Sequence, residues 1–108
     1  MLPHHLPPKL QELNLTGNLI TDIMTRGQEF SSLIHLGISY NMLTDESLPV
    51  IRQSFPKLFC LDISHNRLES ITKTLKVLLT LPGLKMLYLI GNPLMLSVNY
   101  RQVIRTKL

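Results

Sequence analysis

Apolar residues recur along this chain in a pattern that appears four times. Each copy has the form Leu-x-x-Leu-x-Leu/Ile-x-x-Asn-x-apolar, and the copies begin at Leu10, Leu33, Leu58 and Leu84. Every apolar position of the motif is filled in every copy, and the asparagines lie 23, 25 and 26 residues apart. With 44% hydrophobic residues overall, such agreement does not arise by chance. The pattern therefore predicts four stacked repeats.

The apolar residues of each copy predict a short strand, because Leu-x-Leu alternates with a period of two. Strands are expected near residues 12–16, 35–39, 60–64 and 86–90. The spacing leaves room for a return segment after each strand, so the strands pair in parallel. Segments 44–55, with Thr44 as the candidate N-cap, and 72–81 are predicted helices, whereas 21–28 is expected to be irregular. The predicted fold class is α/β.

One polar residue breaks the apolar pattern in every copy. These asparagines are Asn18, Asn41, Asn66 and Asn92. A short amide side chain carries an acceptor and two donor hydrogens, so it can satisfy backbone groups where the chain leaves each strand. We interpret the four residues as a buried structural asparagine ladder rather than as ligand-binding residues.

The motif resembles that of the leucine-rich repeat family over roughly residues 6–96, and it accounts for most of the chain. The resemblance implies a curved, horseshoe-shaped solenoid with a parallel sheet on the concave face and helices or irregular segments on the convex face. Residues 1–108 are then one domain of four repeats, with 93–108 resembling a truncated C-terminal cap. Gly91-Asn-Pro-Leu-Met-Leu96 with Tyr100-Arg101 is similar to the intracellular, cilium-associated group of the family.

The residues that point outward from the predicted strands are the candidate binding residues. Stacking four strands aligns them in columns on the concave face, which suits protein binding because a rigid sheet costs little to order. Tyr40 and Tyr88 are the candidate aromatic anchors. The alternative is that both only cover the sheet. The candidate partner-binding residues are Glu12, Asn14, His35, Tyr40, Asp62 and Tyr88.

Composition and charge narrow the classes of function that this chain can have. The chain carries a net charge of +4, and its six bases after residue 69 are joined by no acid. Those bases are dispersed and lack interleaved aromatic residues, which argues against nucleic-acid binding. One cysteine, Cys60, and four scattered histidines have no metal-ligand spacing, and no catalytic motif occurs. We expect no metal, no cofactor, no small-molecule substrate, no membrane span and no enzymatic activity.

The sequence therefore predicts a non-catalytic protein-interaction module, a scaffold or adaptor whose partner is another protein. The resemblance implies a cytoplasmic localisation, in the cilium or axoneme. A regulatory subunit that binds an enzyme such as a protein phosphatase is the alternative. A further alternative is contact with RNA or a membrane surface through Arg101, Arg105 and Lys107. Cys60 is interpreted as an inert strand residue, although His35 in its column keeps a reactive thiol open.

Overall fold

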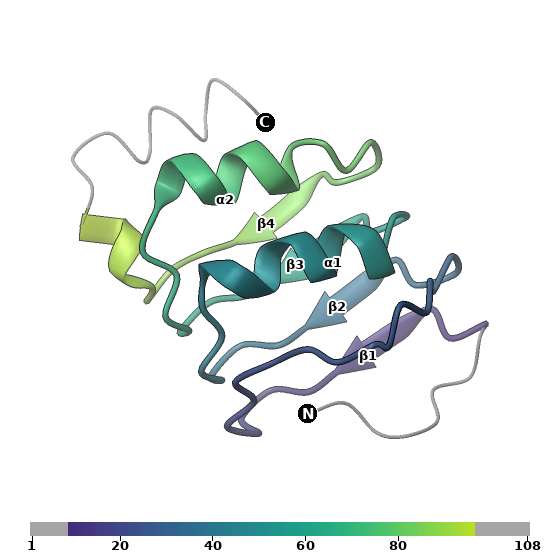
Figure 1. Ribbon diagram of the computed structural model, residues 1–108, viewed down its shortest axis with the longest axis horizontal. Coiled ribbons are helices and arrows are strands. Elements are labelled where there is room, and N and C mark those ends of the chain that lie inside the picture. The colour runs from purple at the N-terminus through teal and green to yellow at the C-terminus, as the bar shows by residue number, and fades with distance from the viewer. Residues whose placement is uncertain (1–8, 97–108) are drawn as a thin grey trace.

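The computed structural model describes residues 9–96 and has a four-stranded parallel sheet as its base (Figure 1). The strands pair in chain order, β1-β2-β3-β4. In register, Leu13, Leu36, Leu61 and Leu87 form one continuous row that points into the core. The strands are β1 (Glu12–Asn14), β2 (His35–Gly37), β3 (Cys60–Asp62) and β4 (Met86–Tyr88).

Each strand ends two residues earlier than the sequence predicts. The cause lies in the carbonyl groups that follow the strands, because an asparagine side chain takes the place of a backbone donor there. The Leu15 carbonyl accepts a hydrogen bond from Asn41 Nδ2 at 3.0 Å, and the Ile38 carbonyl accepts one from Asn66 Nδ2 at 3.0 Å. The regular ladder of strand hydrogen bonds is therefore interrupted at these carbonyls, although single backbone bonds, such as that from the Gly17 N–H to the Ser39 carbonyl at 3.0 Å, still follow.

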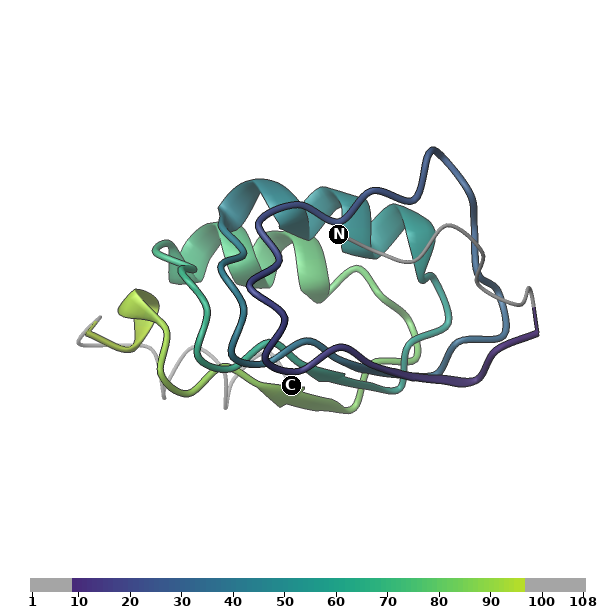
Figure 2. The same cartoon turned by 90° about the horizontal axis from the view of Figure 1, so that it is seen from below.

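The return segments lie on the other side of the sheet and form a second layer (Figure 2). The predicted irregular segment, residues 21–28, contains neither helix nor strand. Predicted helix 44–55 forms as a short 3₁₀ helix, η1 (Asp45–Ser47), followed by α1 (Leu48–Ser54). The other predicted helix is α2 (Ile71–Leu78), and a 3₁₀ turn, η2 (Pro93–Leu96), follows the last strand.

The helix starts differ from the expected cap. Thr44 has extended backbone angles but makes no side-chain hydrogen bond, so it does not cap its helix through the side chain. The carboxylate of Asp45 points instead toward the next repeat, where it accepts from the Glu69 and Ser70 backbone N–H groups at 3.0 and 3.3 Å. Ser70 is the side-chain cap of α2, since its Oγ accepts from Lys73 N at 3.1 Å.

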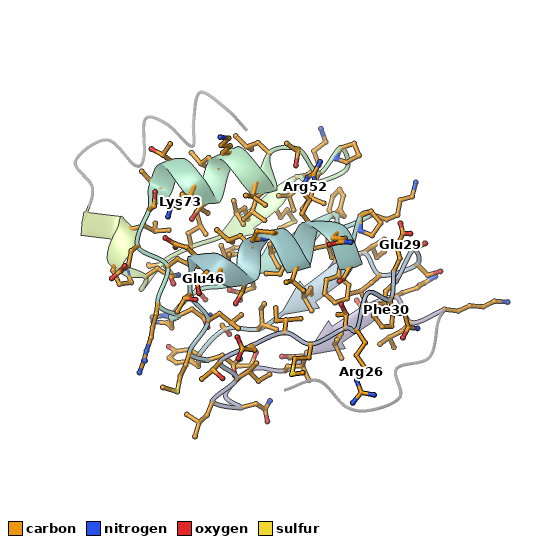
Figure 3. All side chains as sticks on the ribbon, in the orientation of Figure 1. Arg26, Glu29, Phe30, Glu46, Arg52 and Lys73 are labelled. Carbon is orange, nitrogen blue, oxygen red and sulfur yellow. The ribbon has the colours of Figure 1, made fainter. Side chains whose placement is uncertain are left out.

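The core between the two layers consists of the apolar motif positions and of aromatic residues from the return side. Phe30 and Phe55 stack with ring centroids 5.5 Å apart, and the Phe30 N–H donates to the Ser54 carbonyl at 2.7 Å. Figure 3 shows Phe30 beside the C-terminal end of α1, with Arg26 directed away from the molecule. These contacts let the irregular first return cover the core without forming a helix.

Candidate functional site

The concave face, which is the face of the sheet turned away from the helices, carries two complete columns of outward residues. Strand register places one column at Glu12, His35, Cys60 and Met86, and the other at Asn14, Gly37, Asp62 and Tyr88. The parallel pairing thus brings five of the six candidate partner-binding residues onto one surface. Only Tyr40 lies outside these columns.

A hollow of about 380 Å³ opens in this face around Gly37. It exists because Gly37 has no side chain at the centre of the sheet, where a Cβ would already lie 3.4 Å from Asn14 Oδ1. Four of the candidate residues line the hollow. The full lining is Glu12, Leu13, Asn14, His35, Leu36, Gly37, Cys60 and Asp62.

Two polar side chains of the second column are held in the same way on either side of Gly37. Asn14 Oδ1 accepts from the Thr16 N–H at 3.0 Å and from the Thr16 hydroxyl at 2.6 Å. Asp62 Oδ1 accepts from the Ser64 N–H at 3.0 Å and from the Ser64 hydroxyl at 2.6 Å. Each side chain closes a local turn at the end of its strand. Their orientation is thereby fixed before any partner arrives.

Cys60 lies in the hollow, partly buried, and its thiol is held in the neutral form. Burial is the larger cause that raises the pKa of this thiol, and the negative charge of Asp62 raises it further. A raised pKa lowers the fraction of thiolate, which is the reactive form. The raised pKa favours the inert interpretation of Cys60 over a reactive thiol.

Apolar side chains cover the β4 side of the concave face, and the candidate set included only one of them, Tyr88. That side chain is 45% exposed, and Ile90, two residues further along, is 60% exposed. Met86, on the same strand as Tyr88, is exposed as well. Phe59, just before β3, is also exposed, but its ring lies near that of His35 on β2, with centroids 6.1 Å apart. The outward positions of β1, by contrast, are Glu12 and Asn14. We call Met86, Tyr88 and Ile90 the apolar patch.

Tyr40 lies at the turn that follows β2, beside the concave face and outside the hollow lining. Its ring stacks on the His65 ring with centroids 4.2 Å apart and an interplanar angle of 12°, yet it remains 59% exposed. Both residues have positive φ angles, 54° and 53°. In the next repeat the equivalent position is Gly91, where a Cβ would meet His65 Nδ1 at 2.2 Å. The glycine therefore leaves room for the imidazole ring.

The asparagines link successive repeats through both ends of the amide. Asn41 Oδ1 accepts from the Asn18 and Ile20 N–H groups, at 3.0 and 2.9 Å. Asn92 Oδ1 accepts in the same way from the Asn66 and Leu68 N–H groups, at 3.1 and 3.0 Å. Each carbonyl that these amides reach between two repeats accepts hydrogen bonds from two successive asparagines. The Ile38 carbonyl, for example, accepts from Asn41 Nδ2 and from Asn66 Nδ2.

Asn18 departs from the expectation of a buried ladder. Asn41, Asn66 and Asn92 are only 3–6% exposed, whereas Asn18 is exposed. It belongs to the first repeat, so no earlier repeat among the described residues covers it. Its Nδ2 still donates to the Leu15 carbonyl at 2.7 Å, which keeps the turn in the same conformation.

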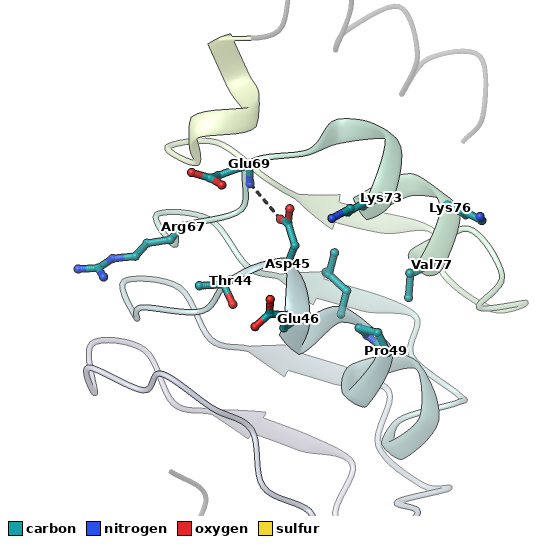
Figure 4. A pocket seen from close by; sticks show the side chains of 10 residues that line it. Thr44, Asp45, Glu46, Pro49, Arg67, Glu69, Lys73, Lys76 and Val77 are labelled. Atoms are coloured by element: carbon teal, nitrogen blue, oxygen red, sulfur yellow. Dashed lines mark hydrogen bonds between the residues drawn. The ribbon is translucent and has the colours of Figure 1, made fainter.

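A second depression, the convex groove, lies between η1, the start of α1 and α2. It has a volume of about 590 Å³, and Figure 4 shows Glu46 and Lys73 on its two sides. Three acidic and three basic side chains line it, so it offers a ligand no single sign of charge. Its lining is Thr44, Asp45, Glu46, Leu48, Pro49, Arg67, Glu69, Lys73, Lys76 and Val77.

Metal ligands do not gather in the described part of the chain: residues 9–96 hold no group of three or more histidine, cysteine, aspartate or glutamate side chains placed to share an ion. Within the same residues, neither α1 nor α2 has the length and hydropathy of a membrane-spanning helix.

The repeated motif, the parallel sheet and the asparagines that join its repeats define a leucine-rich repeat protein. Relatives confirm this resemblance. The chain is 39% identical over 101 residues to Leucine-rich repeat-containing protein 43 of Mus musculus and 38% identical over 100 residues to that of Homo sapiens. These matches cover 91% and 90% of the chain, but only 15% of each relative's length. No family model matches.

Other proteins share the repeats more distantly. Lumican of Oryctolagus cuniculus is 37% identical over 71 residues, which is 65% of this chain and 37% of that protein. Among solved structures, a chain of the Drosophila melanogaster SNF/U2A' complex superimposes with a TM-score of 0.75 at 18% identity. The match covers 93% of this chain and 56% of that one. At that identity the likeness supports the leucine-rich repeat fold alone.

Proposed function

We propose that this chain is a non-catalytic protein-interaction module that binds another protein through its concave face. The observation that carries the proposal is the arrangement of that face, where the hollow around Gly37 lies beside the apolar patch. Exposed aromatic and apolar side chains next to oriented polar groups are the composition of protein interfaces. The role proposed is that of a scaffold or adaptor.

Rigidity favours this surface over the rest of the molecule. Its residues stand on hydrogen-bonded strands, and the side chains of Asn14 and Asp62 are already fixed by their turns. Binding then costs little conformational entropy, so more of the contact energy appears as affinity. Tyr88 is the proposed anchor because its ring is exposed on β4 and two χ angles describe its freedom.

The assembly proposed is a cytoplasmic one in the cilium or axoneme. Its support is the likeness of the repeats to the intracellular, cilium-associated group, together with the match to Leucine-rich repeat-containing protein 43. The solved neighbour supports the module in a general way, because it comes from a complex of two named proteins.

Proximity labelling in ciliated cells tests the proposal, with the full chain, its Tyr88→Ala variant and its Glu46→Ala variant as parallel baits. Glu46 lines the convex groove and serves as the matched surface control. We expect one set of axonemal proteins to be labelled by the wild type and by Glu46→Ala, and about tenfold less by Tyr88→Ala, because truncation of an aromatic anchor weakens binding strongly.

Loss of the same proteins with Glu46→Ala, and not with Tyr88→Ala, would move the interaction to the convex side. Equal labelling by all three baits would remove Tyr88 from the interface. An enzyme such as a phosphatase in the Tyr88-dependent set would assign the chain to the regulatory alternative. Circular dichroism of both variants checks that the fold is unchanged.

A further inference from the structure

We propose that the partner inserts a cationic side chain, arginine or lysine, into the hollow around Gly37 and places an apolar side chain on the apolar patch. This inference rests on the proposed function and adds the chemistry of the partner. It follows from three properties of the concave face: its charge, the shape of the hollow, and the distance from the hollow to the patch.

The charge of the concave face is opposite to that of the chain. The net charge of the whole chain is +4, yet the two carboxylates of Glu12 and Asp62 line the hollow and no lysine or arginine does. The outward columns of the four strands hold no lysine or arginine either, among the residues that the structure describes. A cationic side chain is therefore the complementary occupant.

The hollow also has the form that such a side chain needs. Asp62 on β3 lies directly across from Gly37, whereas Glu12 on β1 lies across from His35, two residues earlier on β2. The two carboxylates therefore stand on opposite sides of β2, diagonally across the hollow. Asp62 uses Oδ1 for its turn, and no hydrogen bond within the described residues occupies Oδ2.

The apolar patch fixes a second point of contact. Tyr88 and Met86 stand on β4, two strands beyond Gly37. Neighbouring strands are about 4.8 Å apart, so the two points are separated by roughly 10 Å. Residues i and i+7 of a helix span about 10.5 Å, and residues i and i+3 of a polyproline II segment about 9.3 Å. The partner segment thus carries a basic and an apolar residue at one of these spacings.

A random peptide library displayed on phage is selected on the immobilised full chain, and the enriched peptides are titrated by fluorescence anisotropy. The variants are Glu12→Gln/Asp62→Asn, which keeps the Oδ1 acceptor for Ser64, Tyr88→Ala, and Glu46→Gln, which removes a carboxylate from the convex groove instead. Titrations are repeated at low and high salt.

We expect enriched peptides with arginine or lysine and an apolar residue at the stated spacing. Their affinity falls about tenfold in the Glu12→Gln/Asp62→Asn variant, falls with salt, and stays unchanged in Glu46→Gln. Peptides without a basic residue that depend on Tyr88 alone would overturn the inference and leave the proposed function standing. No enriched peptide, or peptides insensitive to Tyr88→Ala and to the double variant, would overturn both.

Discussion

A single asparagine side chain joins two repeats at each step of this fold. The Asn66 amide donates to the Ile38 carbonyl of the preceding repeat and to the Ile63 carbonyl of its own, while its Oδ1 accepts the Leu43 N–H at 2.9 Å. Ile38 and Ile63 each receive a second asparagine as well. When Asn66 is removed, these two carbonyls therefore keep a hydrogen bond, whereas the Leu43 N–H loses its acceptor.

Replacing Asn66 by alanine is expected to destabilise the chain by about 2–3 kcal/mol, because it leaves the buried Leu43 N–H without an acceptor and opens a small cavity. The control is Asn18→Ala. Asn18 is exposed, and the Leu15 carbonyl keeps its bond from Asn41, so its loss is expected to cost about 0.5 kcal/mol. Chemical denaturation measures both. Similar losses of stability for the two variants would show that burial does not determine how much each asparagine stabilises the fold.

The Cys60 thiol reports the negative charge of the hollow. Because burial and then Asp62 raise its pKa, less thiolate is present at a given pH in the folded chain than in the unfolded one, and alkylation is expected to be slower in the folded chain. Asp62→Asn lowers the pKa and speeds alkylation. Above the ordinary thiol pKa the same shift reduces stability, since the unfolded chain loses this proton first. Iodoacetamide rates against pH test the direction, and an unchanged Asp62→Asn rate would contradict it.

At the scale of single elements, the sequence predicts the strands and helices well and their ends poorly. Period-two alternation and helical spacing are properties of the elements themselves, so they are visible in one repeat. The ends depend on partners in the neighbouring repeat. Asp45 reaches the backbone of Glu69 and Ser70, and Asn41 takes the Leu15 carbonyl. Such contacts cannot be read from the local sequence.

The two helix starts predict different responses to loss of the hydroxyl. Ser70→Ala removes the acceptor for the Lys73 N–H and is expected to destabilise the chain by about 1 kcal/mol. Thr44→Ala removes no capping bond and is expected to change stability by less than about 0.5 kcal/mol. Thermal unfolding of the two variants compares them directly. A larger loss of stability for Thr44→Ala than for Ser70→Ala would show that Thr44 caps its helix, as the sequence predicts.

At the scale of the whole molecule, the columns of the concave face could be predicted because equal positions of stacked repeats align. Five candidate residues follow from that rule. The hollow could not be predicted so directly, since it arises from the missing side chain of Gly37 between neighbours on two other strands. The stack of Tyr40 on His65 also joins two repeats and depends on positive φ angles.

The net charge of the whole chain and the charge of the concave face have opposite signs. The bases outnumber the acids in the chain, whereas the hollow holds Glu12 and Asp62. A count of charges along the sequence directs attention to the basic residues after position 69. The alignment of equal positions in stacked repeats predicts that the two carboxylates share one face, and the strand register places them there. The surface proposed for binding is thus defined by position in the sheet, not by the net charge.

The most direct test of concave-face binding places a photoactivatable benzophenone amino acid at position 88 or, as the control, at position 46. Tyr88 stands on β4 and Glu46 on the convex side, so the two probes sample opposite layers of one full chain. After irradiation in ciliated cells, mass spectrometry identifies the covalent adducts. Concave-face binding predicts a protein adduct from position 88 and none from position 46. An adduct from position 46 alone would contradict it.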